Sequence, residues 1–88
     1  MGNSQVQQLK HSLSAFSQTT DRAAQTLMQQ SREYDRAAQA VLALIGGTAT
    51  GKDREVANAI QSASHAVEQA GQALSRASRT ARNYGSSI

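Results

Sequence analysis

The seven residues Gly46-Gly47-Thr48-Ala49-Thr50-Gly51-Lys52 decide the fold, because they separate two long stretches that contain no proline. Glycine adopts positive φ angles at little cost, so three glycines within seven residues allow the chain to reverse direction here. Thr50 stands three residues before Asp53, in a variant of the capping box that opens a helix. The segment predicts a turn over residues 46–52, between a helix over about 4–45 and a second over about 53–84. The expected turn glycines are Gly46, Gly47 and Gly51.

Apolar residues recur at alternating steps of three and four on both sides of this turn. The first series runs from residue 6 to residue 44 and the second from residue 56 to residue 84. This period is typical of an α-helix that carries one apolar seam. Only Thr20 and Gln30 interrupt the first seam with polar side chains. We expect the large seam residues to form the core of a hairpin: Leu13, Phe16, Leu27, Tyr34, Val41, Leu44, Val56, Ile60, Val67, Leu74 and Tyr84.

The two seams match each other when the chain is folded back on itself. Facing residues in an antiparallel pair have position numbers with a constant sum, and pairs such as Leu27/Leu74 and Tyr34/Val67 sum to 100 or 101. The sequence therefore predicts one all-α domain over residues 1–88, a two-helix antiparallel hairpin of coiled-coil type.

This hairpin has too thin a core to stand alone. Several seam layers pair alanine with alanine or threonine, and such layers do little to offset the conformational entropy lost on folding. Small residues also flank the seams and widen the apolar face: Ala24, Ala38, Ala40, Ala57, Ser64, Gly71 and Ser78. We expect a second copy or a helical protein partner to complete a four-helix bundle. The expected partner interface has Ala59, Ala66 and Ala73 on one flank and Met28 and Leu42 on the other.

The charges indicate a solvated helix surface. Nine Lys and Arg stand against six Asp and Glu, a net charge of +3, and the chain has no cysteine for disulfides or thiolate metal sites. Arg76, Arg79 and Arg82 follow one another at three-residue spacing, and Arg22 and Lys10 are able to approach the same end. An acidic partner or nucleic acid is one interpretation. Cations near a helix C-terminus are also favoured by the helix dipole, and no aromatic residues interleave for base stacking, so we expect no nucleic-acid binding.

No catalytic, cofactor or metal site follows from the sequence. Residues 46–53 read G-x-x-x-x-G-K-D, one residue short of the phosphate-binding loop, but no strand precedes them and Asp53 replaces the required hydroxyl. His11 and His65 lie far apart, with no ligand-spaced partner nearby. No serine has a base and an orienting group within reach. We expect a protein that is not an enzyme and has no cofactor and no small-molecule substrate.

The chain has no stretch suited to membrane insertion. The first ten residues are polar, and the longest apolar run, residues 40–45, is far too short to span a bilayer. We expect no membrane insertion, and a location in the bacterial cytoplasm or export without a cleavable signal peptide.

The helical hairpin with its glycine-containing turn resembles the WXG100/ESX-type small proteins of type VII secretion, including the helical partners of LXG-type toxins. In Ile45-Gly46-Gly47, Gly47 stands where that family has its turn glycine, and Ile45 takes the place of the apolar residue two positions earlier. The Tyr-x-x-x-Asp/Glu export motif is not matched, because Ile88 follows Tyr84 at the fourth position. The resemblance implies a protein that pairs with a secreted effector carrying the rest of the export signal.

Two other classes fit the same hairpin. One is a cytosolic secretion chaperone or assembly protein of the type III kind, and the other is a basic DNA-associated helix pair. The sequence favours the secretion partner, which would bind the N-terminal helices of an effector.

Overall fold

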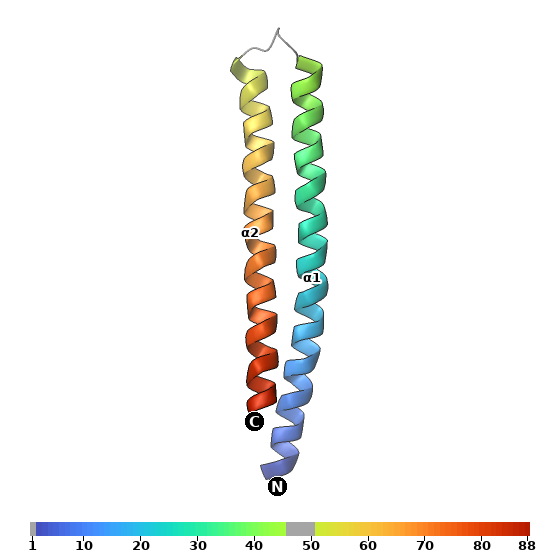
Figure 1. Ribbon diagram of the computed structural model, residues 1–88, viewed down its shortest axis with the longest axis vertical. Helices are drawn as coiled ribbons and strands as arrows, with labels where there is room; N and C mark the ends of the chain where they lie inside the picture. The colour runs from blue at the N-terminus through green and yellow to red at the C-terminus, as the bar shows by residue number, and fades with distance from the viewer. Residues whose placement is uncertain (1, 46–50) are drawn as a thin grey trace.

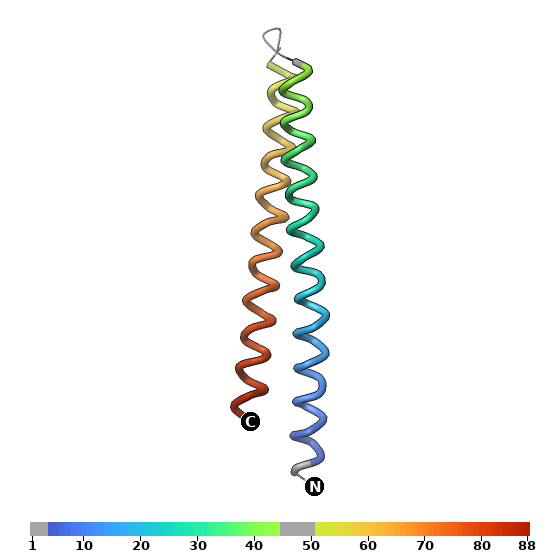
Figure 2. The backbone as a smooth tube through the Cα atoms, turned by 45° about the vertical axis from the view of Figure 1, so that its right-hand side comes forward, coloured from blue at the N-terminus to red at the C-terminus, as the bar shows by residue number. Residues whose placement is uncertain are grey.

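The computed structural model describes residues 2–45 and 51–88, with side chains described over 4–44 and 51–88. Helix α1 spans Gly2–Ile45 and helix α2 spans Gly51–Ser87, and the described residues form no strand. The helices lie side by side and antiparallel, with both chain termini at one end of a body of 71 × 14 × 14 Å (Figure 1). The view turned by 45° shows the same pair of antiparallel helices (Figure 2). The prediction of an all-α helical hairpin is confirmed.

A row of small residues forms the contact between the helices. Seven-residue intervals connect its members on each helix, and these side chains, together with Thr20 and Ala81, are the buried ones among the described residues. Because none of the residues at these seven-residue intervals is larger than serine, the two backbones approach closely. We call this set the contact row: Ser17, Ala24, Ser31 and Ala38 on α1, and Ala57, Ser64, Gly71 and Ser78 on α2.

Hydroxyl groups in the contact row fix which residues face each other. The Ser64 hydroxyl donates to the Ser31 carbonyl at 2.9 Å. A hydroxyl has one proton to give, so the Ser31 hydroxyl is the donor in its own 3.0 Å contact with Ser64 Oγ. Further along, the Ser78 hydroxyl donates to the Ser17 carbonyl at 3.1 Å. A side-chain oxygen as short as that of serine reaches the opposite backbone only when the helices are close.

The predicted pairing of the two seams is wrong by one heptad. The contact-row pairs Ser31/Ser64 and Ser17/Ser78 have numbers that sum to 95. With the helices aligned by these contacts, seam residues at the same height have numbers that sum to about 94. The predicted sum is 100 or 101. One helix is therefore displaced by about seven residues, or about 10 Å along its axis, from the predicted alignment. A slide by seven residues leaves a seven-residue pattern unchanged, so the periodicity alone does not distinguish the two alignments.

The predicted hairpin core is also wrong for its larger members. Phe16, Tyr34, Leu44, Val56 and Tyr84 keep 47%, 39%, 89%, 53% and 51% of their surface exposed. The other predicted core residues are half-buried: Leu13, Leu27, Val41, Ile60, Val67 and Leu74. The buried apolar residues are alanines instead: Ala24, Ala38, Ala57 and Ala81. Side chains as large as Leu or Phe between the helices would push the backbones apart and break the serine hydrogen bonds.

Two seam positions named as polar exceptions have different environments. Thr20 is buried and its hydroxyl donates to the carbonyls of Phe16, at 2.8 Å, and Ser17, at 3.1 Å. Gln30 is exposed, so it does not set the register of the hairpin. No buried side-chain nitrogen or oxygen among the described residues lacks a hydrogen-bond partner.

We predict that Gly71→Leu destabilises the hairpin by about 1–3 kcal/mol, because the added side chain forces the helices apart where they are in close contact. Even a Cβ at Gly71 would lie 3.2 Å from Met28 Sδ and 3.4 Å from the Ala24 carbonyl oxygen. Urea denaturation followed by circular dichroism at one protein concentration measures the change. The matched control is Gly51→Ala, whose Cβ would meet nothing within 4 Å. Equal stability of the Gly71→Leu variant and the parent would contradict the close contact.

Candidate helix-binding surface

The apolar seams of both helices lie on the same face of the hairpin. Successive residues in an α-helix are rotated by about 100° about the helix axis. The seam positions are the third residue after each contact-row residue and the residue immediately before it. These two positions therefore lie about 60° and 100° from the contact, both on the same side of it. The rotation has the same sense in both helices. Because the helices are antiparallel, both seams therefore lie on the same face of the hairpin. We call this surface the apolar stripe.

Large side chains line the apolar stripe and remain accessible. Leu9 and Phe16 on α1, and Tyr84 on α2, mark the end near the termini, whereas Leu44 and Val56 mark the end near the turn. Half-buried Leu27 and Val67 lie between them. The stripe therefore runs along the length over which the two helices overlap. An extended surface of this kind indicates a protein interaction site more often than a solvated face.

Charge is almost excluded from the stripe. Among the residues with described side chains, Asp53 is the one charged residue at a seam position, and it lies in the first turn of α2. The other charges fall elsewhere around the helices, as in the ion pair between Arg82 and Asp21 at 3.0 Å. A partner that covers the stripe beyond the first turn of α2 would therefore bury apolar surface without removing a charge from water.

The predicted partner interface divides between the two faces of the hairpin. Ala59, Ala66 and Ala73 are exposed and border the apolar stripe on α2. Met28 and Leu42 lie four residues after a contact-row residue, so they are turned to the opposite side of the contact. One flat partner surface does not reach both groups. Sequence reasoning missed that the large seam residues, rather than the flanking alanines, dominate the exposed apolar surface.

The contact row is visible in the sequence as a seven-residue spacing of small residues. The prediction from the apolar seams places six of its members only beside the seam: Ala24, Ala38, Ala57, Ser64, Gly71 and Ser78. Their spacing of seven residues on both helices, with Ser17 and Ser31 completing the first series, is the feature that identifies a close helix contact. Small residues at that spacing let helices approach.

The predicted turn lies partly outside the described residues. Gly46 and Gly47 belong to the part that the structure does not describe. Gly51 and Lys52 are exposed and lie in the first turn of α2, which begins two residues earlier than expected. A phosphate-binding loop follows a buried strand and carries Ser or Thr after its Gly-Lys pair. Here the described segment before the turn is helix α1, and Asp53 follows Lys52.

The histidines and carboxylates are dispersed over the described part of the chain. No group of three or more His, Cys, Asp or Glu residues is placed there to hold a metal ion. His11 and His65 are exposed, and His65 Nε2 lies 3.3 Å from Gln69 Nε2. Over its described residues, neither helix contains a segment that is long and apolar enough to cross a bilayer.

The chain matches no protein-family model, no curated protein and no solved structure.

We predict that Lys52→Ala leaves the thermal midpoint within about 2 °C of the parent, because the side chain is exposed in the first turn of α2. Circular dichroism measures the melting, and isothermal titration with ATP and Mg²⁺ measures any nucleotide binding by the parent. Nucleotide binding that disappears in the Lys52→Ala variant would restore the phosphate-loop interpretation.

Proposed function

We propose that this chain is a non-enzymatic helical partner protein, whose apolar stripe packs against helices of another chain to complete a four-helix bundle. The observation that supports the proposal is the stripe itself. Both helices contribute large apolar residues to one face, whereas the contact row between them consists of small residues. Knobs-into-holes packing of further helices against such a face is the usual way to bury it.

The size of the stripe suits a stable complex. The hairpin is 71 Å long and two helices wide. A second hairpin lying along most of that face would bury on the order of 1,000 Å² per partner, above the roughly 800 Å² per partner of a standard interface. Alanines and serines in the contact row bury little apolar surface, so covering the stripe would supply much of the hydrophobic stabilisation.

We further propose that the helices bound in the cell belong to the N-terminal region of a larger protein exported by a type VII system. The resemblance of the hairpin, and of the sequence Ile45-Gly46-Gly47 between its helices, to WXG100/ESX-type proteins supports this assignment. The bound partner would lie along the apolar stripe, with Ala59, Ala66 and Ala73 at its edge. In the absence of that partner, a second copy of this chain would cover the same surface.

We predict that the isolated protein self-associates, because the exposed stripe residues gain from burial. Its thermal midpoint should rise with protein concentration, and sedimentation velocity at micromolar concentration should show a species larger than one chain. A compact monomer that melts cooperatively at a concentration-independent temperature would count against the need for a partner.

We predict that Ala70→Glu disrupts the complex with the exported partner. Ala70 is exposed and lies in the middle of the stripe, so a glutamate there would bury an unpaired charge in the complex without disturbing the free hairpin. Coexpression with the neighbouring large open reading frame, followed by affinity purification, measures complex formation. Asn58→Glu is the matched control, because Asn58 is exposed on α2 one residue after the contact row and faces away from the stripe.

The complex should survive Asn58→Glu and be lost with Ala70→Glu. Separate elution of the two parent proteins, together with unchanged secretion of the neighbour after deletion of this gene, would reject the export-partner proposal.

A further inference from the structure

The face opposite the apolar stripe carries a groove between the two helices. One hollow of about 460 Å³ is lined by Asp21, Ala24, Gln25, Met28, Gln29, Arg32 and Ser75. A second, of about 290 Å³, is lined by Met28, Gly71, Gln72, Ser75, Arg76 and Arg79. Because Met28 and Ser75 belong to both, the hollows form one continuous feature, which we call the basic groove.

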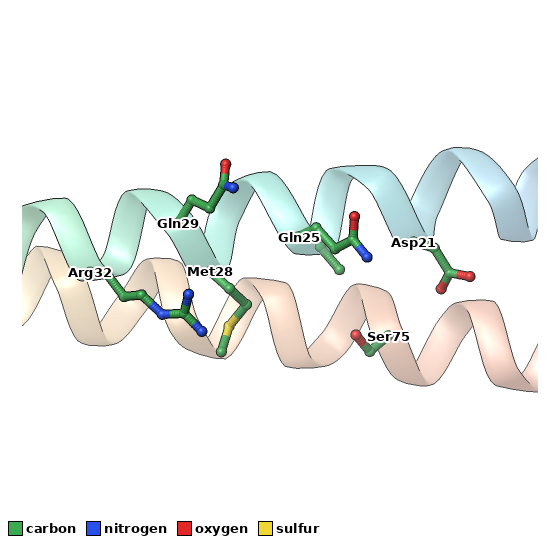
Figure 3. A pocket seen from close by; sticks show the side chains of 7 residues that line it. Asp21, Gln25, Met28, Gln29, Arg32 and Ser75 are labelled. Carbon is green, nitrogen blue, oxygen red and sulfur yellow. The ribbon is translucent and has the colours of Figure 1, made fainter.

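The side chain of Met28 gives the basic groove an apolar floor where its two hollows meet. The half-buried Met28 side chain reaches from α1 toward α2, as Figure 3 shows, and lies over Gly71. Its Sδ is 3.2 Å from the position a Cβ on Gly71 would occupy. Because glycine has no Cβ, the space above Gly71 accommodates the Met28 side chain. A flexible, polarisable thioether at the floor of a hollow is well suited to contact an apolar side chain of variable shape.

The walls of the basic groove carry positive charge without internal carboxylate partners. Arg76 and Arg79 are exposed on the α2 side, and neither forms an ion pair with a described residue. The carboxylate of Asp21, at the far end of the groove, is bound to Arg82 at 3.0 Å. Arg32 lines the α1 wall, and its guanidinium lies on the same side of the ribbon as Met28 (Figure 3). These arginines are available for an external anion.

The shape and chemistry of the groove favour a peptide over other anions. A hollow that contains Met28 admits a side chain, whereas a flat membrane or the cylinder of a nucleic-acid duplex would contact only the rims. The three aromatic residues, Phe16, Tyr34 and Tyr84, occupy seam positions on the other face, so none is placed to stack on bases. Arginine side chains pair with carboxylates through two parallel hydrogen bonds.

We propose that the basic groove binds an acidic peptide segment, with one apolar side chain seated on Met28 and carboxylates held by Arg76 and Arg79. This site goes beyond the proposed helix binding, because it lies on the opposite face of the hairpin. The two surfaces are therefore able to be occupied together, one by apolar helices and the other by an acidic segment.

The test uses the full chain and a fluorescein-labelled peptide that carries a leucine between two pairs of glutamates, with fluorescence anisotropy at physiological salt. The double variant Arg76→Gln/Arg79→Gln should weaken binding about tenfold, or about 1.4 kcal/mol. The control Arg36→Gln/Arg54→Gln removes the same charge from exposed arginines that line neither hollow and should change the affinity by less than about twofold. Met28→Gln should weaken binding several-fold with every charge retained.

Four results would overturn the proposal. The first is no peptide binding at millimolar concentration, and the second is equal binding of a peptide with glutamines in place of the glutamates. The third is an equal loss of peptide affinity in the two double variants. The fourth is displacement of the peptide by a more tightly bound DNA duplex or by vesicles containing phosphatidylserine. Ala70→Glu separates this test from that of the proposed function. It should leave peptide binding intact even where it abolishes helix binding.

Discussion

The close contact between the two backbones is the constraint on which the rest of the molecule depends. Ser64 and Ser78 donate hydrogen bonds to carbonyl oxygens of the opposite helix, and the contact row consists of alanine, serine and glycine. Burial of such small side chains stabilises the hairpin little, but their hydrogen bonds fix its alignment. The large apolar residues are then left beside the contact rather than within it. The apolar stripe is thus a direct consequence of the contact row.

The sequence was sufficient to predict the helices because their signals are local. Three- and four-residue apolar spacing, the lack of proline and the glycines near residue 46 each act within a few turns of chain. The predicted ends agree closely at Ile45, whereas α2 begins at Gly51 rather than near Asp53. The alignment of the helices is not local information. Both alignments preserve the heptad pattern, and the choice between them depends on how near the backbones approach.

The same uncertainty explains why the candidate surface was predicted only in part. Apolar seam residues such as Phe16 and Val56 were assigned to a core because large apolar side chains are usually buried. Serine and alanine give a weaker signal, since they occur both at close contacts and on solvated helix surfaces. Ala59 and Ala66 are exposed beside the stripe, whereas Met28, on the second flank of the expected partner interface, lies across the contact over Gly71. Only the rotation of each helix about its axis separates these residues.

The separation of apolar and charged residues between faces has a consequence for assembly. Two hairpins that meet through their stripes bring together leucine, valine and aromatic side chains, while arginines such as Arg76 and Arg79 stay in water on the outside. The net charge of +3 then opposes association only weakly, because at physiological salt the Debye length is about 8 Å and charges beyond it are screened. The outer surface keeps its groove whether or not the stripe is covered. Burial of the apolar stripe and the proposed binding of an acidic segment in the basic groove depend on different residues. A substitution in one surface is therefore able to change its binding without changing that of the other.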